Sequence, residues 1–326
     1  MQFLPLRFAL RGTWVLLLAG GLSTAQQLPE APTVQGSGQK PSPAKTAESP
    51  SQKAAPQNPS DQSAPAKEKV FIPASAERHY HQGLLYEREG DTADAVTEYR
   101  DAVREYPDYF EPHYALGRID YDKHGYLDAI KEFKEAVRLK PNDADAHNNL
   151  GLALKHNADL NGAIAEYQEA VRLNPKLAAA QNNLANALYA KRQFAGAIEH
   201  YRAAIAIEPK SAQTRMNLGS ALDDAGKADE AITEYKEALK LEPKNAKIHY
   251  NLSIVYQKKK DMPAAITELK AAAKLSPDWP TPHIMLANLL KDSDPKAAID
   301  ECVVADGLTH DAKLHDQCLE LQKKVQ

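Results

Sequence analysis

The chain has 326 residues, a formal net charge of −4 at pH 7, 43% apolar and 26% charged residues, and only 15 glycines. This composition is typical of a soluble protein made mainly of helices, and it lacks the strongly basic footprint of a nucleic-acid-binding protein. The two cysteines do not form a CxxC motif, so nothing supports thiol oxidoreductase chemistry.

Residues 1–25 have the pattern of an export signal. Arg7 and Arg11 precede an apolar run over residues 13–22, and small residues then offer a cleavage site before Gln26. The run is shorter than the ~20 residues that a membrane-spanning helix needs. We therefore predict a periplasmic or secreted protein, whose net charge changes from −4 to −6 when cleavage removes the two arginines. An uncleaved membrane anchor is the alternative.

Residues 26–70 are predicted to form a disordered linker. The segment is rich in Ser, Gln and Ala, has no aromatic residue, and contains eight prolines, at positions 29, 32, 41, 43, 50, 56, 59 and 65. Such a composition buries too little apolar surface to offset the entropy lost on ordering the chain. A proline-rich recruitment motif is the alternative interpretation.

Beyond the linker the chain is built from repeats. Proline recurs every 34 residues, as Pro107, Pro141, Pro175, Pro209, Pro243 and Pro277. With this proline at position 32, the units are 76–109, 110–143, 144–177, 178–211, 212–245 and 246–279. A degenerate seventh unit, 280–312, lacks one residue in its turn, and residues 311–325 are predicted to form a capping helix.

Equivalent positions of the units carry similar side chains. Position 7 is mostly Leu, position 8 is Gly, Ala or Ser, and positions 20 and 27 are Ala in all six units. Position 24 is Tyr99, Phe133, Tyr167, Tyr201, Tyr235 and Leu269. This pattern resembles the tetratricopeptide repeat family. The spacing itself predicts two amphipathic helices in each unit. We therefore expect an all-α solenoid of helical hairpins, which the resemblance implies to be a right-handed superhelix.

The resemblance implies that the first helices line a concave groove, with positions 2, 5, 6, 9, 12 and 13 facing it. Asparagine recurs there, as Asn149, Asn183, Asn217 and Asn251 at position 6 and as Asn148, Asn182 and Asn186 beside them. Each amide offers a donor and an acceptor, so the row suits the backbone of an extended peptide. It is similar to the row in the repeat domain of O-linked N-acetylglucosamine transferase, which holds substrate polypeptide. A structural role, in which the amides bond neighbouring helices, is the alternative.

Aromatic residues are the second set of candidates for partner contact. They are Tyr80, Tyr114 and Tyr250 at position 5 and Tyr189 at position 12. The alternative is that these rings only complete the packing of the helices. Family members that clamp a C-terminal carboxylate carry a lysine at position 5, which is missing here, so carboxylate clamping is not expected.

Histidine recurs at position 4, as His79, His113, His147, His249 and His283. The row is spread along the solenoid and does not converge on one point, so no metal site is expected. We expect burial between helices instead, with some pH sensitivity below about 6.5.

Cys302 and Cys318 are the only cysteines. A turn near Thr309 would place Cys302 opposite residue 317 of the capping helix, so we predict a disulfide between the two. Two buried free thiols are the alternative.

The sequence lacks the motifs GxSxG, HExxH, GxxxxGK[ST] and GxGxxG. We predict a protein that is not an enzyme and needs no cofactor, nucleic acid or small-molecule substrate. Its predicted function is to bind a partner protein or an extended peptide as an interaction module or scaffold. The alternative is a passive structural or spacer subunit of an envelope assembly, making contact through its convex face or its ends.

Overall fold

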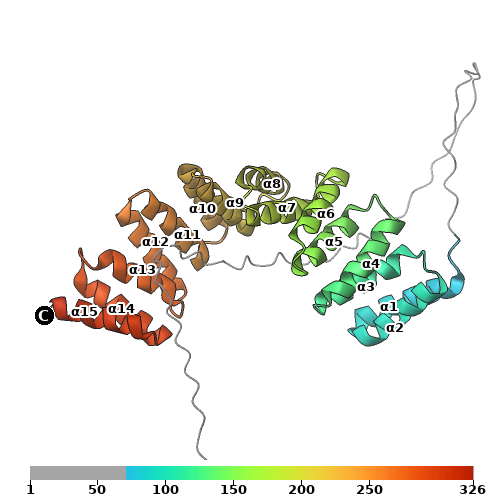
Figure 1. The fold of residues 1–326 in the computed structure, drawn as a ribbon, viewed down its shortest axis with the longest axis horizontal. Coiled ribbons are helices and arrows are strands. Elements are labelled where there is room, and N and C mark those ends of the chain that lie inside the picture. The colour runs from blue at the N-terminus through green and yellow to red at the C-terminus, as the bar shows by residue number, and fades with distance from the viewer. Residues whose placement is uncertain (1–70, 326) are drawn as a thin grey trace, which may run out of the picture. The chain divides into compact units, whose positions relative to one another are not determined.

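The computed structural model describes residues 71–325, so the predicted export signal and linker lie outside the described residues. This range contains fifteen helices and no strand (Figure 1). They are α1 (Ala74–Glu89), α2 (Thr92–Glu105), α3 (Phe110–Asp122), α4 (Tyr126–Leu139), α5 (Ala144–His156), α6 (Leu160–Leu173), α7 (Ala178–Ala190), α8 (Phe194–Ile207), α9 (Ala212–Asp224), α10 (Ala228–Leu241), α11 (Ala246–Lys258), α12 (Met262–Leu275), α13 (Pro280–Leu290), α14 (Pro295–Thr309) and α15 (Ala312–Val325).

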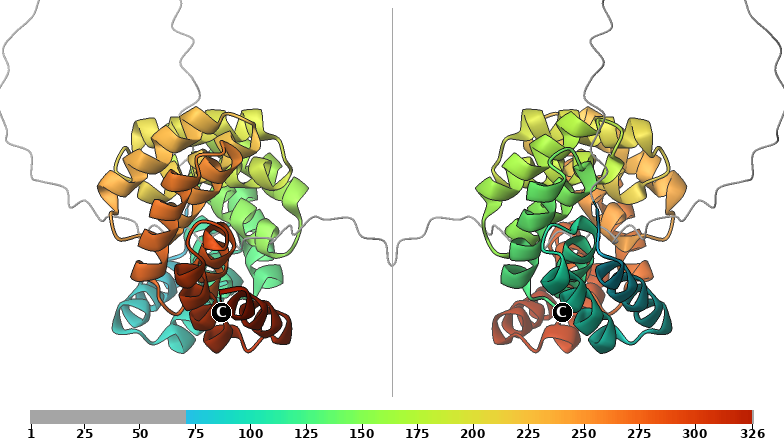
Figure 2. Two further views of the ribbon diagram at one scale, coloured as in Figure 1. Left: turned by 90° about the vertical axis from the view of Figure 1, so that its left-hand side faces the viewer. Right: turned by 90° about the vertical axis from the view of Figure 1, so that its right-hand side faces the viewer.

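The helices pack in consecutive pairs, and the second helix of each pair contacts the first helix of the next. Each repeat unit therefore contributes one hairpin, with the odd-numbered helix first and the even-numbered helix second. Seen end-on, successive hairpins turn about the long axis of the array, which makes residues 71–325 a solenoid (Figure 2). The all-α solenoid predicted from the 34-residue period is confirmed.

The turn inside each of the first six hairpins uses a residue in the left-handed conformation. These residues recur every 34 positions, as Gly90, His124, Ala158, Arg192, Gly226 and Lys260, with φ between 58° and 86°. Only two of the six are glycines, although glycine alone adopts this conformation without steric cost. Several second helices then begin with an aspartate cap, as where Asp159 accepts a hydrogen bond from Gly162 N at 2.9 Å.

Close packing of small residues against aromatic rings explains two of the sequence columns. A Cβ atom on Gly151 would lie 2.6 Å from Cε1 of Tyr167, and one on Gly117 would lie 2.7 Å from the Phe133 ring. The glycine thus lets the ring of position 24 lie against the backbone of the first helix. The rings of Tyr167 and its counterparts are almost completely buried.

The C-terminal end departs from the regular pattern. In the seventh repeat the side chains of His283 and Glu301 are in contact 18 residues apart, whereas the equivalent pair elsewhere is 19 residues apart, which reflects the shortened turn. Cys302 therefore stands at position 24, where the first five repeats have an aromatic residue. A disulfide joins it to Cys318 of α15, with a Cα–Cα distance of 5.6 Å, and both cysteines are buried.

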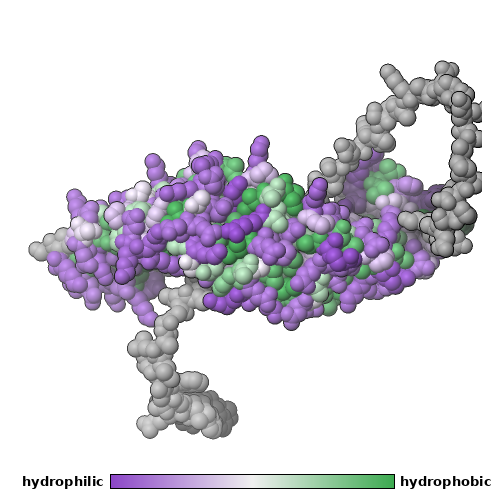
Figure 3. Space-filling view, turned by 90° about the horizontal axis from the view of Figure 1, so that it is seen from above, coloured by the Kyte–Doolittle hydropathy of each residue, from purple (hydrophilic) through white to green (hydrophobic). Residues whose placement is uncertain are grey.

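The surface of the array is mostly hydrophilic on the face shown in Figure 3, with hydrophobic residues visible between the charged ones. None of the described helices is both long enough and apolar enough to cross a membrane.

Candidate partner-binding surface

The first helices line the inner side of the solenoid. Neighbouring first helices from α3 to α11 contact one another, whereas neighbouring second helices come less close. An array whose first helices approach each other more closely must curve toward that side. The concave surface is therefore made by the odd-numbered helices, and it holds both sets of candidate residues.

The position-6 asparagines link successive repeats. Asn149 Nδ2 donates to Tyr114 Oη of the preceding repeat at 2.7 Å. Asn183 Nδ2 donates to Asn148 Oδ1 at 2.9 Å in the same way, and Asn217 Nδ2 donates to Asn186 Oδ1 at 3.2 Å. At three of its four positions, the amide of this row thus bonds the neighbouring repeat, as the structural alternative requires. The sequence could not decide this, because periodicity does not show whether a polar side chain meets solvent or the next repeat.

Burial divides the asparagines further. Asn148, Asn183 and Asn217 are only 5–6% exposed, so an approaching peptide would not reach their amides in this conformation. The partly exposed members are Asn149, Asn182, Asn186 and Asn251. Asn182 Oδ1 is shielded from solvent without a hydrogen-bond partner, which leaves an unsatisfied acceptor in the middle of the row.

The four tyrosines are all half-buried on the concave surface. The Tyr250 ring lies 4.8 Å from the Trp279 ring, and Tyr189 Oη donates to Asp224 Oδ2 at 2.5 Å. Tyr114 stacks on Phe110, with ring centroids 5.6 Å apart. Burial, followed by the carboxylate of Asp145, raises the pKa of Tyr114 to about 12, so its hydroxyl keeps its proton at neutral pH. Each of the four residues thus remains partly exposed after packing.

The histidine row forms a clamp that sequence reasoning missed. The position-4 side chain of the first helix contacts position 23 of the second helix in every repeat. The pairs are His79–Glu98, His113–Glu132, His147–Glu166, Gln181–His200, Arg215–Glu234, His249–Glu268 and His283–Glu301. In five of these repeats the same position-4 side chain also reaches the carbonyl of the preceding position-32 proline. A recurring glutamate 19 residues after the histidine was the available signal.

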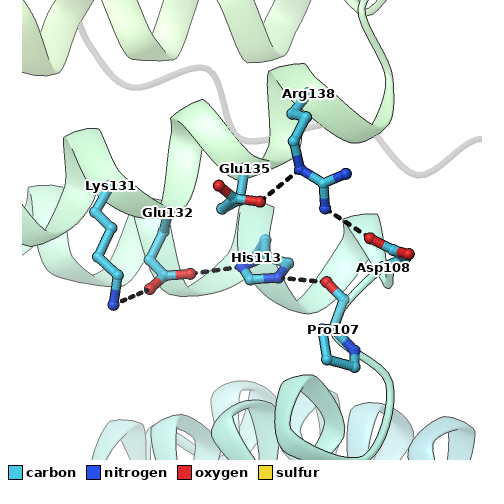
Figure 4. A network of polar contacts seen from close by, with 7 residues as sticks. All are labelled: Pro107, Asp108, His113, Lys131, Glu132, Glu135 and Arg138. Carbon is cyan, nitrogen blue, oxygen red and sulfur yellow. Dashed lines mark hydrogen bonds and ion pairs between the residues drawn. The ribbon is translucent and has the colours of Figure 1, made fainter.

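In the second and sixth repeats the clamp favours a charged imidazole, whereas burial lowers the pKa of His200 in the fourth repeat. His113 Nδ1 lies 2.6 Å from Glu132 Oε2, and its Nε2 lies 3.0 Å from Pro107 O (Figure 4). Both partners accept hydrogen bonds, so both ring nitrogens must carry protons to satisfy them. Burial lowers the pKa of His113, but the hydrogen bonds to Glu132 and Pro107 outweigh it, and the net pKa is raised. The pKa of His249 is raised by its Glu268 hydrogen bond in the same way.

This finding corrects the expected pH dependence. Some pH sensitivity below about 6.5 was expected from burial of the histidines between helices. The glutamate partners instead stabilise the imidazolium ion, so the stabilisation from His113 and His249 is lost above that pH.

Charge is unevenly distributed along the concave positions. The first three repeats carry more acidic than basic side chains there, namely Glu77, Glu87, Glu111, Asp122 and Asp145 against Arg88, Arg118 and Lys155. The last two repeats carry Lys247, Lys258 and Lys291 against one acid, Asp292. Within residues 71–325, no group of three or more His, Cys, Asp or Glu side chains could hold a metal ion.

Family models account for most of the array. A model described as TPR repeat matches residues 185–226 and 223–260. Three models described as tetratricopeptide repeat match residues 114–178, 79–109 and 246–278. The chain belongs to the tetratricopeptide repeat family. No curated protein matches its sequence.

Solved structures include other tetratricopeptide proteins similar to this chain. MamA is 30% identical over 51% of this chain and 96% of its own, with a TM-score of 0.48. Pseudomonas aeruginosa PilF is 18% identical, covers 64% of this chain and 95% of its own, and has a TM-score of 0.54. A chain of the Cut9–Hcn1 hetero-tetramer of APC/C is 19% identical, covers 74% of this chain and 48% of its own, and has a TM-score of 0.52. At these identities, PilF and Cut9–Hcn1 show a shared fold and nothing further.

Proposed function

We propose that this tetratricopeptide array binds a partner protein, through an extended segment, along its concave surface. Membership of the family supports a protein-interaction module in general. The concave location is supported by the side chains that remain partly exposed after the repeats have packed. These are Tyr80, Tyr114, Asn149, Asn182, Asn186, Tyr189, Tyr250 and Asn251, which we name the groove row.

The groove row carries the proposal because it joins two properties on the concave surface. Its amides and hydroxyls are able to bond a peptide backbone, and its rings offer apolar area. Because packing already fixes the rings of Tyr114 and Tyr250, little side-chain entropy is lost when a partner binds. The unpaired Oδ1 of Asn182 would gain a partner if its side chain turned toward a bound peptide amide.

The role proposed here is non-catalytic. The groove row contains only amides and phenols. Among the candidate bases, the clamp histidines are engaged between the two helices of their own repeats. The alternative is a passive spacer that makes contact through its second helices or its ends, for which the bonds between successive repeats provide the rigidity.

We also propose that the protein acts outside the cytoplasm after cleavage before Gln26. The disulfide between Cys302 and Cys318 supports this, since structural disulfides persist in oxidising compartments. N-terminal sequencing of the protein recovered from an envelope or secreted fraction tests it. A mature chain beginning at Gln26 is expected, and an intact N-terminus on a cytoplasmic protein would overturn the proposal.

Two matched variants of the full chain test binding in the groove. The concave variant carries Ala190→Arg on α7 and Asn251→Arg on α11, which adds bulk and charge to one exposed and one partly exposed concave position. The control carries Ala206→Arg on α8 and Thr233→Arg on α10, both exposed on second helices. Circular dichroism must show equal helicity for both variants.

Affinity capture from an envelope or secreted extract is then compared between the variants. A partner lost by the concave variant and kept by the control supports groove binding. Equal capture by both, or loss by the control alone, would move the interface to the convex face or the ends and favour the spacer alternative.

A further inference from the structure

A cleft of about 220 Å³ opens between α13 and α15, at the C-terminal end of the concave surface. We name it the C-terminal cleft. Its apolar lining consists of Ile284, Ala287, Cys302, Leu314 and Leu321. Its polar lining consists of Asn288, Lys291, Gln317, Glu320 and Lys324. Ile284, Asn288 and Lys291 hold positions 5, 9 and 12 of the seventh repeat, so the cleft continues the row of concave positions.

The cleft lies where an aromatic ring is missing from the repeat pattern. In four earlier repeats, the ring at position 24 fills the space beside the glycine at position 8 of the same repeat, as Tyr167 does beside Gly151. In the seventh repeat these positions are Cys302 and Ala287, and both line the cleft. The disulfide of Cys302 holds α15 in place, but its sulfurs have far less volume than a tyrosine ring.

The charge at the cleft mouth is positive. Lys291 and Lys324 are exposed on opposite sides of the cleft, and neither is in an ion pair within residues 71–325. Glu320 is the only acidic lining residue. The neighbouring concave positions of the sixth repeat add Lys247 and Lys258, the latter paired with Asp223. An acidic segment would therefore meet favourable charge at this end of the groove.

We infer that the C-terminal cleft receives an aromatic side chain from an acidic segment of the partner. The ring would pack on the partly exposed apolar side chains of the cleft, Ile284 and Leu321, while flanking carboxylates pair with Lys291 and Lys324. This inference rests on the proposed function, since it names the chemistry of the segment at one end of the same concave surface. It also sets a direction for the bound segment, with its acidic end toward α15.

Fluorescence anisotropy on the full chain tests the inference with a defined probe. The probe is a short fluorescein-labelled peptide of Asp and Glu with one central Phe. One comparison peptide has Ala in place of Phe, and another has Lys in place of the acids. The charge variant is Lys291→Glu with Lys324→Glu, and its control is Lys296→Glu with Lys313→Glu, two exposed lysines that do not line the cleft.

The acidic Phe peptide is expected to bind the native chain, and both comparison peptides are expected to bind at least about tenfold more weakly. The charge variant is expected to raise the Kd of the Phe peptide about tenfold or more, and the control is expected to change it less than about twofold. A Gln317→Trp variant, which places its own ring at the cleft, is expected to weaken binding of the Phe peptide as well.

Absence of binding to the native chain, or binding that is indifferent to the Phe and to Lys291 and Lys324, would overturn the inference. The proposed function is judged separately, because Ala190 and Asn251 do not line the cleft. Partner capture that depends on those two positions, with no binding of the Phe peptide, would contradict the inference about the C-terminal cleft. It would still support partner binding along the groove row.

Discussion

His113 and Glu132 join the two helices of the second repeat through a contact of 2.6 Å between Nδ1 and Oε2. The same histidine reaches back to Pro107 O at 3.0 Å, so one side chain ties a repeat together and fixes it to the preceding one. His147 and His249 make the same pair of contacts in the third and sixth repeats. Protonation of His113 and His249 thereby affects both the hairpins and their stacking.

His113 and His249 predict that stability falls as the pH rises. The pKa values of His113 and His249 are raised in the folded state. Their stabilisation is therefore complete below the ordinary histidine pKa of about 6.5 and is lost as the pH rises through the folded values. The urea midpoint of the full chain is expected to be lower at pH about 8 than at pH about 6.

The control for this prediction is the pair Glu132→Gln and Glu268→Gln. These changes remove the charge that favours the imidazolium ion but keep an oxygen able to accept a hydrogen bond. The decrease in midpoint between the two pH values is expected to become smaller. An unchanged decrease would show that other groups determine the pH dependence.

The asparagine row predicts unequal costs for the same substitution. Asn183→Ala removes a buried donor and leaves Asn148 Oδ1 unpaired, so it is expected to lower the free energy of unfolding by about 1–3 kcal/mol. Asn251→Ala removes a partly exposed amide and is expected to change the free energy of unfolding by less than about 0.5 kcal/mol. Urea denaturation of the two variants checks the difference, and equal effects would argue against a structural role for Asn183.

Glycine-to-alanine substitutions at two sites are predicted to have opposite effects. Gly151→Ala places a methyl group 2.6 Å from Tyr167 Cε1, so it is expected to destabilise the array by about 1–3 kcal/mol. Gly307 lies within α14 with nothing within 4 Å of an added Cβ. Gly307→Ala is therefore expected to stabilise its helix by about 0.5–1 kcal/mol. Thermal melts of both variants test this packing. An unchanged melting temperature for Gly151→Ala would contradict the close contact between Gly151 and Tyr167.

The disulfide is predicted to hold the C-terminal cap locally. It closes a loop with a sequence separation of 16, for which loop entropy gives a stabilisation of about 3 kcal/mol. In a solenoid each repeat contacts only its neighbours, so reduction is expected to speed hydrogen exchange in α15 and leave α5 to α8 unchanged. Reductant should have no such effect on a Cys302→Ala, Cys318→Ala variant. Loss of protection throughout the array would refute a local role.

Periodicity in the sequence was enough to predict the hairpins. The spacing of Pro107 and its counterparts set the repeat length, and the small and aromatic columns identified the packed faces. Periodicity could not show whether Asn183 and Asn217 bind a partner or bond the neighbouring repeat, because a polar side chain on a first helix is able to face either solvent or the next repeat. The contact between neighbouring repeats decides this, and it is a property of the stacked array.

The histidine clamp was within reach of the sequence but was not predicted. A histidine followed 19 residues later by a glutamate recurs in the repeats, as in His113 and Glu132. The glutamates were missed because the histidine column was considered alone. The fourth repeat, with Gln181 and His200, shows the roles exchanged between the two helices. For the same reason the expected pH range was wrong for His113 and His249, because their glutamate partners raise the pKa of both.

The most direct test of the concave binding surface is site-specific photocrosslinking. A photoreactive phenylalanine analogue is introduced into the full chain at Asn251 of α11 on the concave surface or at Ala206 of α8 on the outer surface. Each protein is irradiated with the captured partner. We predict crosslinks to the partner from position 251 and none from position 206. Crosslinks from position 206 alone would contradict binding in the groove and place the interface on the second helices.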